Sequence, residues 1–293
     1  MQWNPRVAVM AAPLLVGWLA GAAMAQQAPA QAQGTQAQGT QVQGTQVQGT
    51  QAQATPPAGR LGLRIEVEPR AIQLLQGMCA ALTGARSLSF NAVATYESMA
   101  RTGHPLAYAT AFEVLMQRPD RLRVVMPGDG PASEFYYDGT RMIAFAPEAN
   151  LVAVADAPPT IDAMLQKAYA DAAIYFPFGD LLGADPCREM QEGLRVVFVV
   201  GQSRVVGGVT TDVLAFANDQ LQGQIWIGAE DRLPRLFRAT YFDDPQTYRH
   251  AIAFSDWRLN PPVPADAFAS ARAAQANPMS FARPDAPTRA PQR

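Results

Sequence analysis

Short segments in which apolar and polar residues alternate recur along this chain, and they constrain its fold more than any other feature. From Ser87 the pattern has a period of two, with Phe90, Ala92, Ala94 and Tyr96 on one face of a predicted strand. Further strand-like runs, each bounded by turn residues, span Tyr108–Gln117, Arg121–Met126, Glu134–Tyr137, Arg141–Ala146 and Leu151–Ala155. A second series covers Arg195–Val205, Thr210–Ala217, the hairpin within Gln222–Arg238, and Tyr248–Trp257. Such an order predicts a large antiparallel meander and not βαβ units.

Helical patterns precede and interrupt the two series of strands. Glu68–Gly84 has apolar residues at helical spacing, with Pro69 in the first turn and a glycine as the stop. A second helix is expected after Thr160, a candidate N-cap, and a short third one from Pro177. Two or three helices are too few to cover both faces of the sheet, so we expect an α+β fold in which one face curls around them.

The first 25 residues predict a secretory signal peptide. Arg6 precedes an apolar stretch from Val7 to Leu19, and Ala23-Met24-Ala25 forms an A-x-A cleavage site. The apolar stretch is too short to be a membrane anchor. We therefore expect an exported mature chain with no transmembrane segment.

The remainder divides by composition into three parts. Residues 26–59 lack charge and contain a repeat of the type QAQGT, which predicts a disordered Gln/Ala/Gly/Thr linker. Residues 60–270 are expected to form a single globular domain, and residues 271–293, rich in Pro, Ala and Arg, a disordered tail.

Charge and cysteine content restrict the partners and the cross-links. Without Arg6, 22 of the 23 basic residues remain against 25 acidic ones, and because no basic stripe is present, nucleic-acid binding is not expected. Cys79 and Cys187 are the only cysteines. They could pair in an oxidising compartment, and two free buried thiols are the alternative.

Residues suited to catalysis or metal binding form no recognisable pattern. The two histidines, His104 and His250, lie on distant segments, whereas a zinc site needs three or four ligands at characteristic spacings. The stretch GQSRV at Gly201 begins like a nucleophile elbow but lacks its closing glycine. We therefore predict a protein that is not an enzyme and that needs no cofactor or metal; an unrecognised hydrolase is the remaining alternative.

Several segments between Glu68 and Phe268 carry a family resemblance. They read EPRAIQLLQGM, QRPDRLRVV, FYYDGTRMIAFAPEANLVAVADAPPTIDAML, QIWIGAEDRLPR and FSDWRLNPPVPADAF. With these segments in this order, the chain resembles a family of predicted periplasmic proteins of unknown function in the superfamily of the lipoprotein carriers LolA and LolB. Relatives often carry a histidine at the place of Val213, so any role of such a histidine does not transfer to this chain.

The resemblance implies a fold and a class of ligand. The fold is LolA-like: a strongly curved antiparallel β-sheet, or unclosed barrel, with a few helices that plug its open side. In the carriers the apolar concave face accepts the acyl chains of lipoproteins. We therefore expect a monomeric periplasmic protein that binds or carries a lipid or an acylated lipoprotein on this face. The alternative is a structural or sensory module of the cell envelope that binds another envelope protein and fills its core with its own side chains.

Apolar residues on the predicted inward faces of the strands are the candidates for ligand binding. In the hairpin, Trp226 alternates with two of them and is expected on the outer face. The full set is Phe90, Tyr96, Phe112, Met116, Leu122, Val124, Met126, Tyr137, Ile143, Phe145, Ile225, Ile227, Phe237 and Tyr241. Ordinary packing between sheet and helices is the alternative role for each.

Overall fold

A computed structural model describes residues 67–128 and 130–283, so the expected signal peptide (1–25) and linker (26–59) lie outside the described residues. The strands are β1 (Ser87–Met99), β2 (Pro105–Gln117), β3 (Arg121–Met126), β4 (Ser133–Tyr137), β5 (Arg141–Ala146), β6 (Leu151–Asp156), β7 (Val196–Ser203), β8 (Thr211–Ala217), β9 (Leu221–Gly228), β10 (Pro234–Tyr241), β11 (Arg249–Leu259) and β12 (Asn277–Met279). The helices are α1 (Pro69–Thr83), α2 (Ile161–Ala172), α3 (Gly179–Leu182), α4 (Arg188–Gln191) and the 3-10 helix η2 (Ala273–Gln275). None of the helices in the described part is long and apolar enough to cross a membrane.

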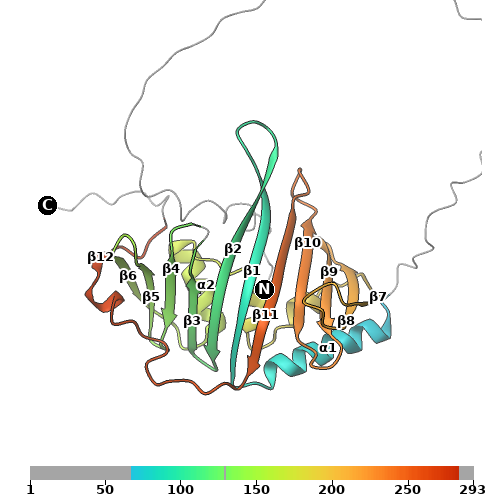
Figure 1. Ribbon diagram of the computed structural model, residues 1–293, viewed down its shortest axis with the longest axis horizontal. Helices are drawn as coiled ribbons and strands as arrows, with labels where there is room; N and C mark the ends of the chain where they lie inside the picture. The colour runs from blue at the N-terminus through green and yellow to red at the C-terminus, as the bar shows by residue number, and fades with distance from the viewer. Residues whose placement is uncertain (1–66, 129, 284–293) are drawn as a thin grey trace, which may run out of the picture. The chain divides into compact units, whose positions relative to one another are not determined.

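All of these strands belong to one sheet in the order β12-β6-β5-β4-β3-β2-β1-β11-β10-β9-β8-β7 (Figure 1). Strands β1–β6 and β7–β11 each form a meander of sequential hairpins, and the antiparallel pairing of β1 with β11 joins the two meanders at the centre. The sheet is curved, and because β12 and β7 are its two edges, it is not closed into a barrel. The predicted fold class is thereby confirmed, with one addition: β12 pairs with β6 in parallel.

Helices α1, α2 and α3 pack on one face of this sheet and bury a single main core. Figure 1 shows α1 along the lower end of the β7–β10 half and α2 behind the β2–β4 half. Leu75 and Met78 of α1 and Met164 of α2 are at most 1% exposed and belong to the same core cluster as the strands. Pro69 occupies the first turn of α1, and the Thr160 hydroxyl caps α2, both as predicted from the sequence. We call the helix-covered face of the sheet the concave face.

The domain extends further than the sequence pattern indicated. Residues 271–283 were expected to belong to the tail, yet they contain η2 and β12. Ala273 of η2 is 2% exposed and packs against Phe145. The boundary expected at residue 270 is therefore too early. A strand of three residues that includes a proline is too short to give a periodic signal.

The β9–β10 hairpin has two apolar faces. Ile225 and Ile227 lie in the main core, whereas Trp226 packs with Val213 and Leu236 in a separate cluster on the opposite face. The outward position predicted for Trp226 is therefore correct, although its side chain is covered. The guanidinium of Arg238 lies 5.4 Å from the centre of the indole ring and contributes to that cover.

Candidate functional site

Most of the predicted ligand-binding residues lie on the concave face, but as part of a filled core. Phe90, Phe112 and Tyr137 are between 0% and 6% exposed. The same core cluster contains Met116, Leu122, Val124, Ile225 and Ile227, with Met126 and Phe237 packed against it. Their burial agrees with the face predicted for them and also with ordinary core packing.

Two predicted residues, Ile143 and Phe145, lie on the opposite face. Tyr137, which is in the main core, pairs with Met142, so Met142 points to the core and its neighbour Ile143 does not. Phe145 packs with Ala273 of η2 in a separate cluster. Their assignment to the concave face is therefore wrong. Strand β5 is apolar at both alternating positions, so only its register with β4 reveals which side faces the helices.

Two phenylalanines that are not among the residues predicted from the sequence occupy the centre of the concave face. Phe176 and Phe178 stand on the connection between α2 and α3, with ring centres 5.9 Å apart. Phe178 makes edge contacts with Phe90 at 5.5 Å and Phe112 at 5.2 Å, and Phe176 contacts Phe135 at 5.3 Å. We call Phe176 and Phe178 the aromatic plug. The available signal was the motif Phe-Pro-Phe, two large apolar residues in a stretch assigned to a helix boundary.

The segment that follows the plug is fastened to the rest of the domain at two points. The Arg118 side chain donates to the carbonyl oxygens of Leu182 at 3.3 Å and of Gly183 at 2.8 Å. Cys187, the N-cap of α4, forms a disulfide with Cys79 of α1, with the two Cα atoms 5.8 Å apart. These links tie the plug segment to the β2–β3 turn and to α1.

The remaining two predicted residues, Tyr96 and Tyr241, lie where the central strands extend beyond the buried core. Tyr96 pairs with Tyr108 across β2 and with His250 across β11, so the three residues are neighbours on one face. The rings of Tyr96 and Tyr108 stack 5.5 Å apart, and Tyr241 meets His250 edge-on at 5.2 Å. Tyr108 is 45% exposed. We call Tyr96, Tyr108, Tyr241 and His250 the tyrosine mouth.

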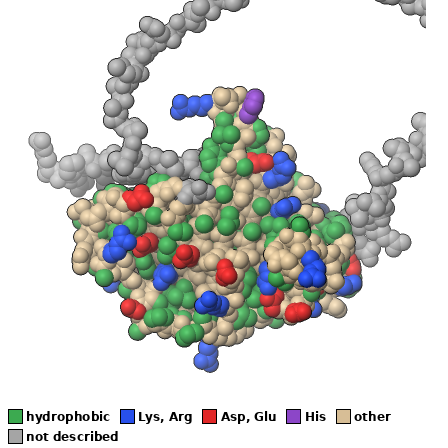
Figure 2. All heavy atoms as spheres, viewed as in Figure 1, with side chains coloured by type: hydrophobic (Ala, Val, Ile, Leu, Met, Phe, Trp, Pro, Cys, Tyr) green, Lys and Arg blue, Asp and Glu red, His purple; other side chains and the backbone are tan. Residues whose placement is uncertain are grey.

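Burial favours the uncharged forms of Tyr96, Tyr241 and His250 through their pKa values. Burial raises the pKa of Tyr241 to about 12, and the carboxylates of Asp180 and Asp243 act in the same direction. Burial also raises the pKa of Tyr96 and lowers that of His250. Near neutral pH these three side chains are therefore neutral, so the mouth continues the core as an aromatic surface. Apolar side chains also lie along the projecting β1–β2 hairpin in Figure 2.

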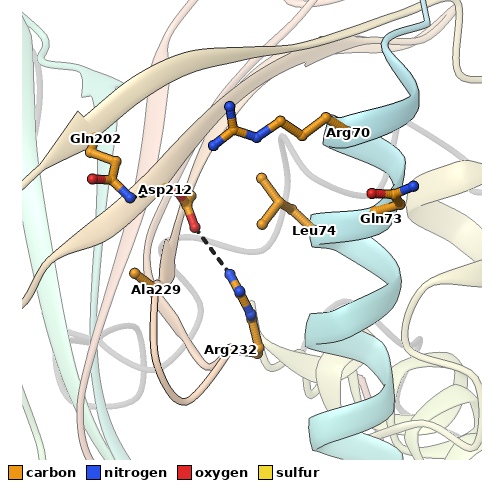
Figure 3. Close-up of a pocket in the computed structure, with 7 residues that line it drawn as sticks. All are labelled: Arg70, Gln73, Leu74, Gln202, Asp212, Ala229 and Arg232. Atoms are coloured by element: carbon orange, nitrogen blue, oxygen red, sulfur yellow. Dashed lines mark hydrogen bonds and ion pairs between the residues drawn. The ribbon is translucent and has the colours of Figure 1, made fainter.

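Two cavities lie beside α1 and away from the aromatic plug. One of about 350 Å³ is lined by Arg70, Gln73 and Leu74 of α1, and by residues of β7, β8 and the β9–β10 turn (Figure 3). The other, of about 620 Å³, lies next to the disulfide and includes Asp185 and Arg188 in its wall. Neither of these cavities is lined by any residue that the sequence analysis proposed for ligand binding.

Several solved structures are similar to this chain at low sequence identity. A LolA superfamily protein from Nitrosomonas europaea is 10% identical, with a TM-score of 0.33 over 68% of this chain and 97% of its own. LprF from Mycobacterium bovis is 16% identical, with a TM-score of 0.42 over 67% of this chain and 97% of its own. A chain of the MucA/MucB complex of Pseudomonas aeruginosa is 15% identical, with a TM-score of 0.37 over 71% of this chain and 62% of its own. A comparison with curated proteins finds no match.

The sequence profile of one family covers nearly the whole described domain. The family is described as predicted periplasmic protein (DUF2092), and its profile matches residues 71–282, a range that includes every strand of the sheet. The resemblance noted in the sequence is thus confirmed, and the chain belongs to this family of predicted periplasmic proteins.

Proposed function

We propose that this protein is a periplasmic, non-enzymatic binding protein that takes an apolar chain onto its concave face. The ligand is the acyl chain of a lipid or of an acylated protein, and it reaches the face through the tyrosine mouth. The observation that carries the proposal is this mouth: Tyr96 and Tyr241 are uncharged and partly buried, and they continue the apolar core to the solvent. An amphipathic ring of this kind suits the point where an apolar ligand leaves water.

The aromatic plug provides the space that such a ligand needs. Phe176 and Phe178 stand on a connection without regular secondary structure, between Ala172 at the end of α2 and Gly179 at the start of α3. Moving this connection disturbs two backbone hydrogen bonds at the start of α3, which the N–H groups of Gly179 and Leu181 donate to the carbonyls of Phe176 and Phe178. Exposing two buried Phe side chains costs about 3–6 kcal/mol. At about 0.8 kcal/mol per buried CH₂, an acyl chain with more than about eight methylenes offsets that cost.

A charge placed in the mouth tests the proposal. A Tyr108→Glu variant puts a carboxylate where the acyl chain passes, so we expect at least about a tenfold weaker affinity for a dansyl-labelled fatty acid in a fluorescence titration. Val93→Glu is the matched control, because Val93 is also 45% exposed but points to the opposite face of the same hairpin. Equal affinity of both variants, or the absence of saturable binding by the wild type, contradicts the proposal.

One observation favours a second candidate function, that of an envelope protein-interaction module. The concave face is filled by the protein's own side chains, with Phe178 only 1% exposed. A module of this kind keeps the plug in place and presents its exposed hairpin to a protein partner. Native mass spectrometry of the protein purified from its own periplasm separates the two candidates. Copurified lipid supports the proposed lipid-binding function. A lipid-free protein that also binds no fatty-acid probe supports the interaction module.

A further inference from the structure

The smaller cavity, between α1 and the β7–β9 side of the sheet, has a polar wall with an excess of positive charge. Arg70 and Arg232 contribute two guanidinium groups, and Asp212 contributes the one carboxylate among the lining residues. Figure 3 shows Arg70 reaching from α1 toward the strands, with Arg232 on the other side of the opening. The lining thus carries a net charge of +1 in a space of about 350 Å³.

The carboxylate of Asp212 is built into the sheet and holds its neighbours in place. Its side chain is 5% exposed. One oxygen accepts from the Gln202 amide at 3.0 Å, and the other accepts from Nη1 of Arg232 at 3.0 Å. Both oxygens are therefore occupied within the protein. A guanidinium has five N–H donors in a planar fork, so Arg232 keeps donors for a further acceptor.

The β9–β10 turn delivers Arg232 to the cavity and gives the carboxylate of the neighbouring Asp231 other partners. Asp231, the preceding residue, forms an ion pair with Arg235 on the same turn and accepts from the backbone N–H of Leu233. The aliphatic part of Arg232 packs close to Gly77 of α1, where a Cβ atom would lie 3.6 Å from its Cδ. The recognisable sequence GAEDRLPR thus positions a half-exposed arginine against a helix.

Arg70 is placed against the preference of its own helix. It lies in the first turn of α1, where the helix dipole disfavours a cation by about 0.3–1 kcal/mol. Among the described residues it has no ion-pair or hydrogen-bond partner. The helix also has no acidic residue in its first turn. An anion bound between Arg70 and Arg232 would satisfy both guanidinium groups and the positive end of the helix.

We propose that this cavity is a binding site for a small oxyanion, a carboxylate or phosphate group, held by Arg70 and Arg232. Asp212 and Gln202 act as positioning residues that orient Arg232. The group belongs either to a free small anion or to the head of an amphiphile. This site is separate from the aromatic plug and does not depend on the function proposed for the concave face.

Titration of the full mature chain with inorganic phosphate and with acetate, at constant ionic strength, tests the site. We expect isothermal calorimetry to show saturable binding at millimolar concentration. Arg70→Gln should weaken this affinity at least about tenfold, because it removes one charge-assisted contact to the anion. Arg70 has no structural partner in the described domain, so this variant should keep the wild-type Tm. Arg195→Gln is the control, because this substitution removes the same charge. Arg195 pairs with Asp219 on an exposed surface away from the cavity.

Short-chain lipids then identify the source of the oxyanion. If dihexanoyl phosphatidic acid binds more tightly than phosphate, and Arg70→Gln abolishes this gain in affinity, the site binds the headgroup of an amphiphile. Phosphate or acetate binding without that gain assigns it to a free anion. No saturable binding of any of these probes, or equal weakening by Arg70→Gln and Arg195→Gln, overturns the proposal.

Discussion

At the scale of single residues, Phe178 shows how much of the core depends on the plug. Its ring is 1% exposed and contacts Phe90, Phe112 and Phe176. We expect Phe178→Ala to lower the free energy of unfolding by about 3–5 kcal/mol, because it leaves a cavity in a packed aromatic cluster. Urea denaturation measures the loss. Phe242→Ala is the control, since Phe242 is 54% exposed and should change stability by no more than about 0.5 kcal/mol. A Phe178→Ala effect as small as the control would mean that the ring does not fill the core.

His250 gives the domain a pH dependence with a definite sign. Burial lowers the pKa of its imidazole below the ordinary 6.5, and the carboxylates of Asp244 and Glu97 only partly oppose this. The unfolded chain therefore binds a proton at a higher pH than the folded chain does. The contribution to stability is present above the unfolded pKa and is lost as the pH falls through the folded pKa.

We therefore expect the free energy of unfolding to fall between about pH 7 and pH 5, and to fall less in His250→Asn. Urea denaturation over this range, with His104→Asn as the control, measures the difference. His104 is exposed, so this variant should follow the wild type. Equal slopes for the wild type and His250→Asn would contradict the prediction.

At the scale of elements, the segment η2–β12 covers the edge of β6 and the ring of Phe145. Ala273 covers Phe145, and the guanidinium of Arg272 lies 5.6 Å from the centre of the same ring. We expect a chain ending at Ser270 to lose about 2 kcal/mol of stability and to self-associate, because Phe145 and the edge of β6 become exposed. Thermal denaturation and light scattering measure both effects. A chain ending at Arg283 keeps the segment and is the matched control; identical behaviour of the two chains would show that the segment is dispensable.

The disulfide connects α1 with the segment that follows the plug. The two cysteines are 108 residues apart, and closing a loop of this length stabilises a chain by up to about 4–5 kcal/mol in the chain-entropy account. We expect dithiothreitol to lower the Tm of the wild type. The double variant Cys79→Ala, Cys187→Ala is the control and should not respond, because the chain has no other cysteines. A wild-type Tm that does not change on verified reduction would contradict the prediction.

At the scale of the whole molecule, the proposed function couples this cross-link to ligand uptake. The disulfide holds Cys187, which follows Phe176 and Phe178 in the chain, against α1. If the plug must move, reduction should accelerate binding of the fluorescent fatty acid in a stopped-flow experiment while the Tm falls. The Val93→Glu variant should respond to reduction as the wild type does. An unchanged binding rate in fully reduced protein would show that the disulfide does not restrict access of the ligand.

Much of this architecture could be predicted from local patterns. The alternation in Arg121–Met126 predicts β3, and the apolar run Arg141–Ala146 between turn residues predicts β5, both with the bounds that the structure has; Thr160 predicts the start of α2. The faces of β5 could not be predicted, because Met142, Ile143 and Phe145 are all apolar. The C-terminal strand β12 was missed, because its three residues are held by pairing with β6 and not by their own propensity.

The sequence by itself determined the order of strands and helices, the open antiparallel sheet and, through its motifs, membership in a family of predicted periplasmic proteins. The order of the elements and the antiparallel pairing follow from local periodicity and turn chemistry, whereas the open form of the sheet is what the family resemblance implies. Only the tertiary structure decided that Phe176 and Phe178 fill the concave face and that Arg70 and Arg232 share a cavity. These residues lie on segments far apart in the chain. Side-chain periodicity determines which face of its own element a residue occupies, but the curvature and packing of the sheet determine which residues that face meets.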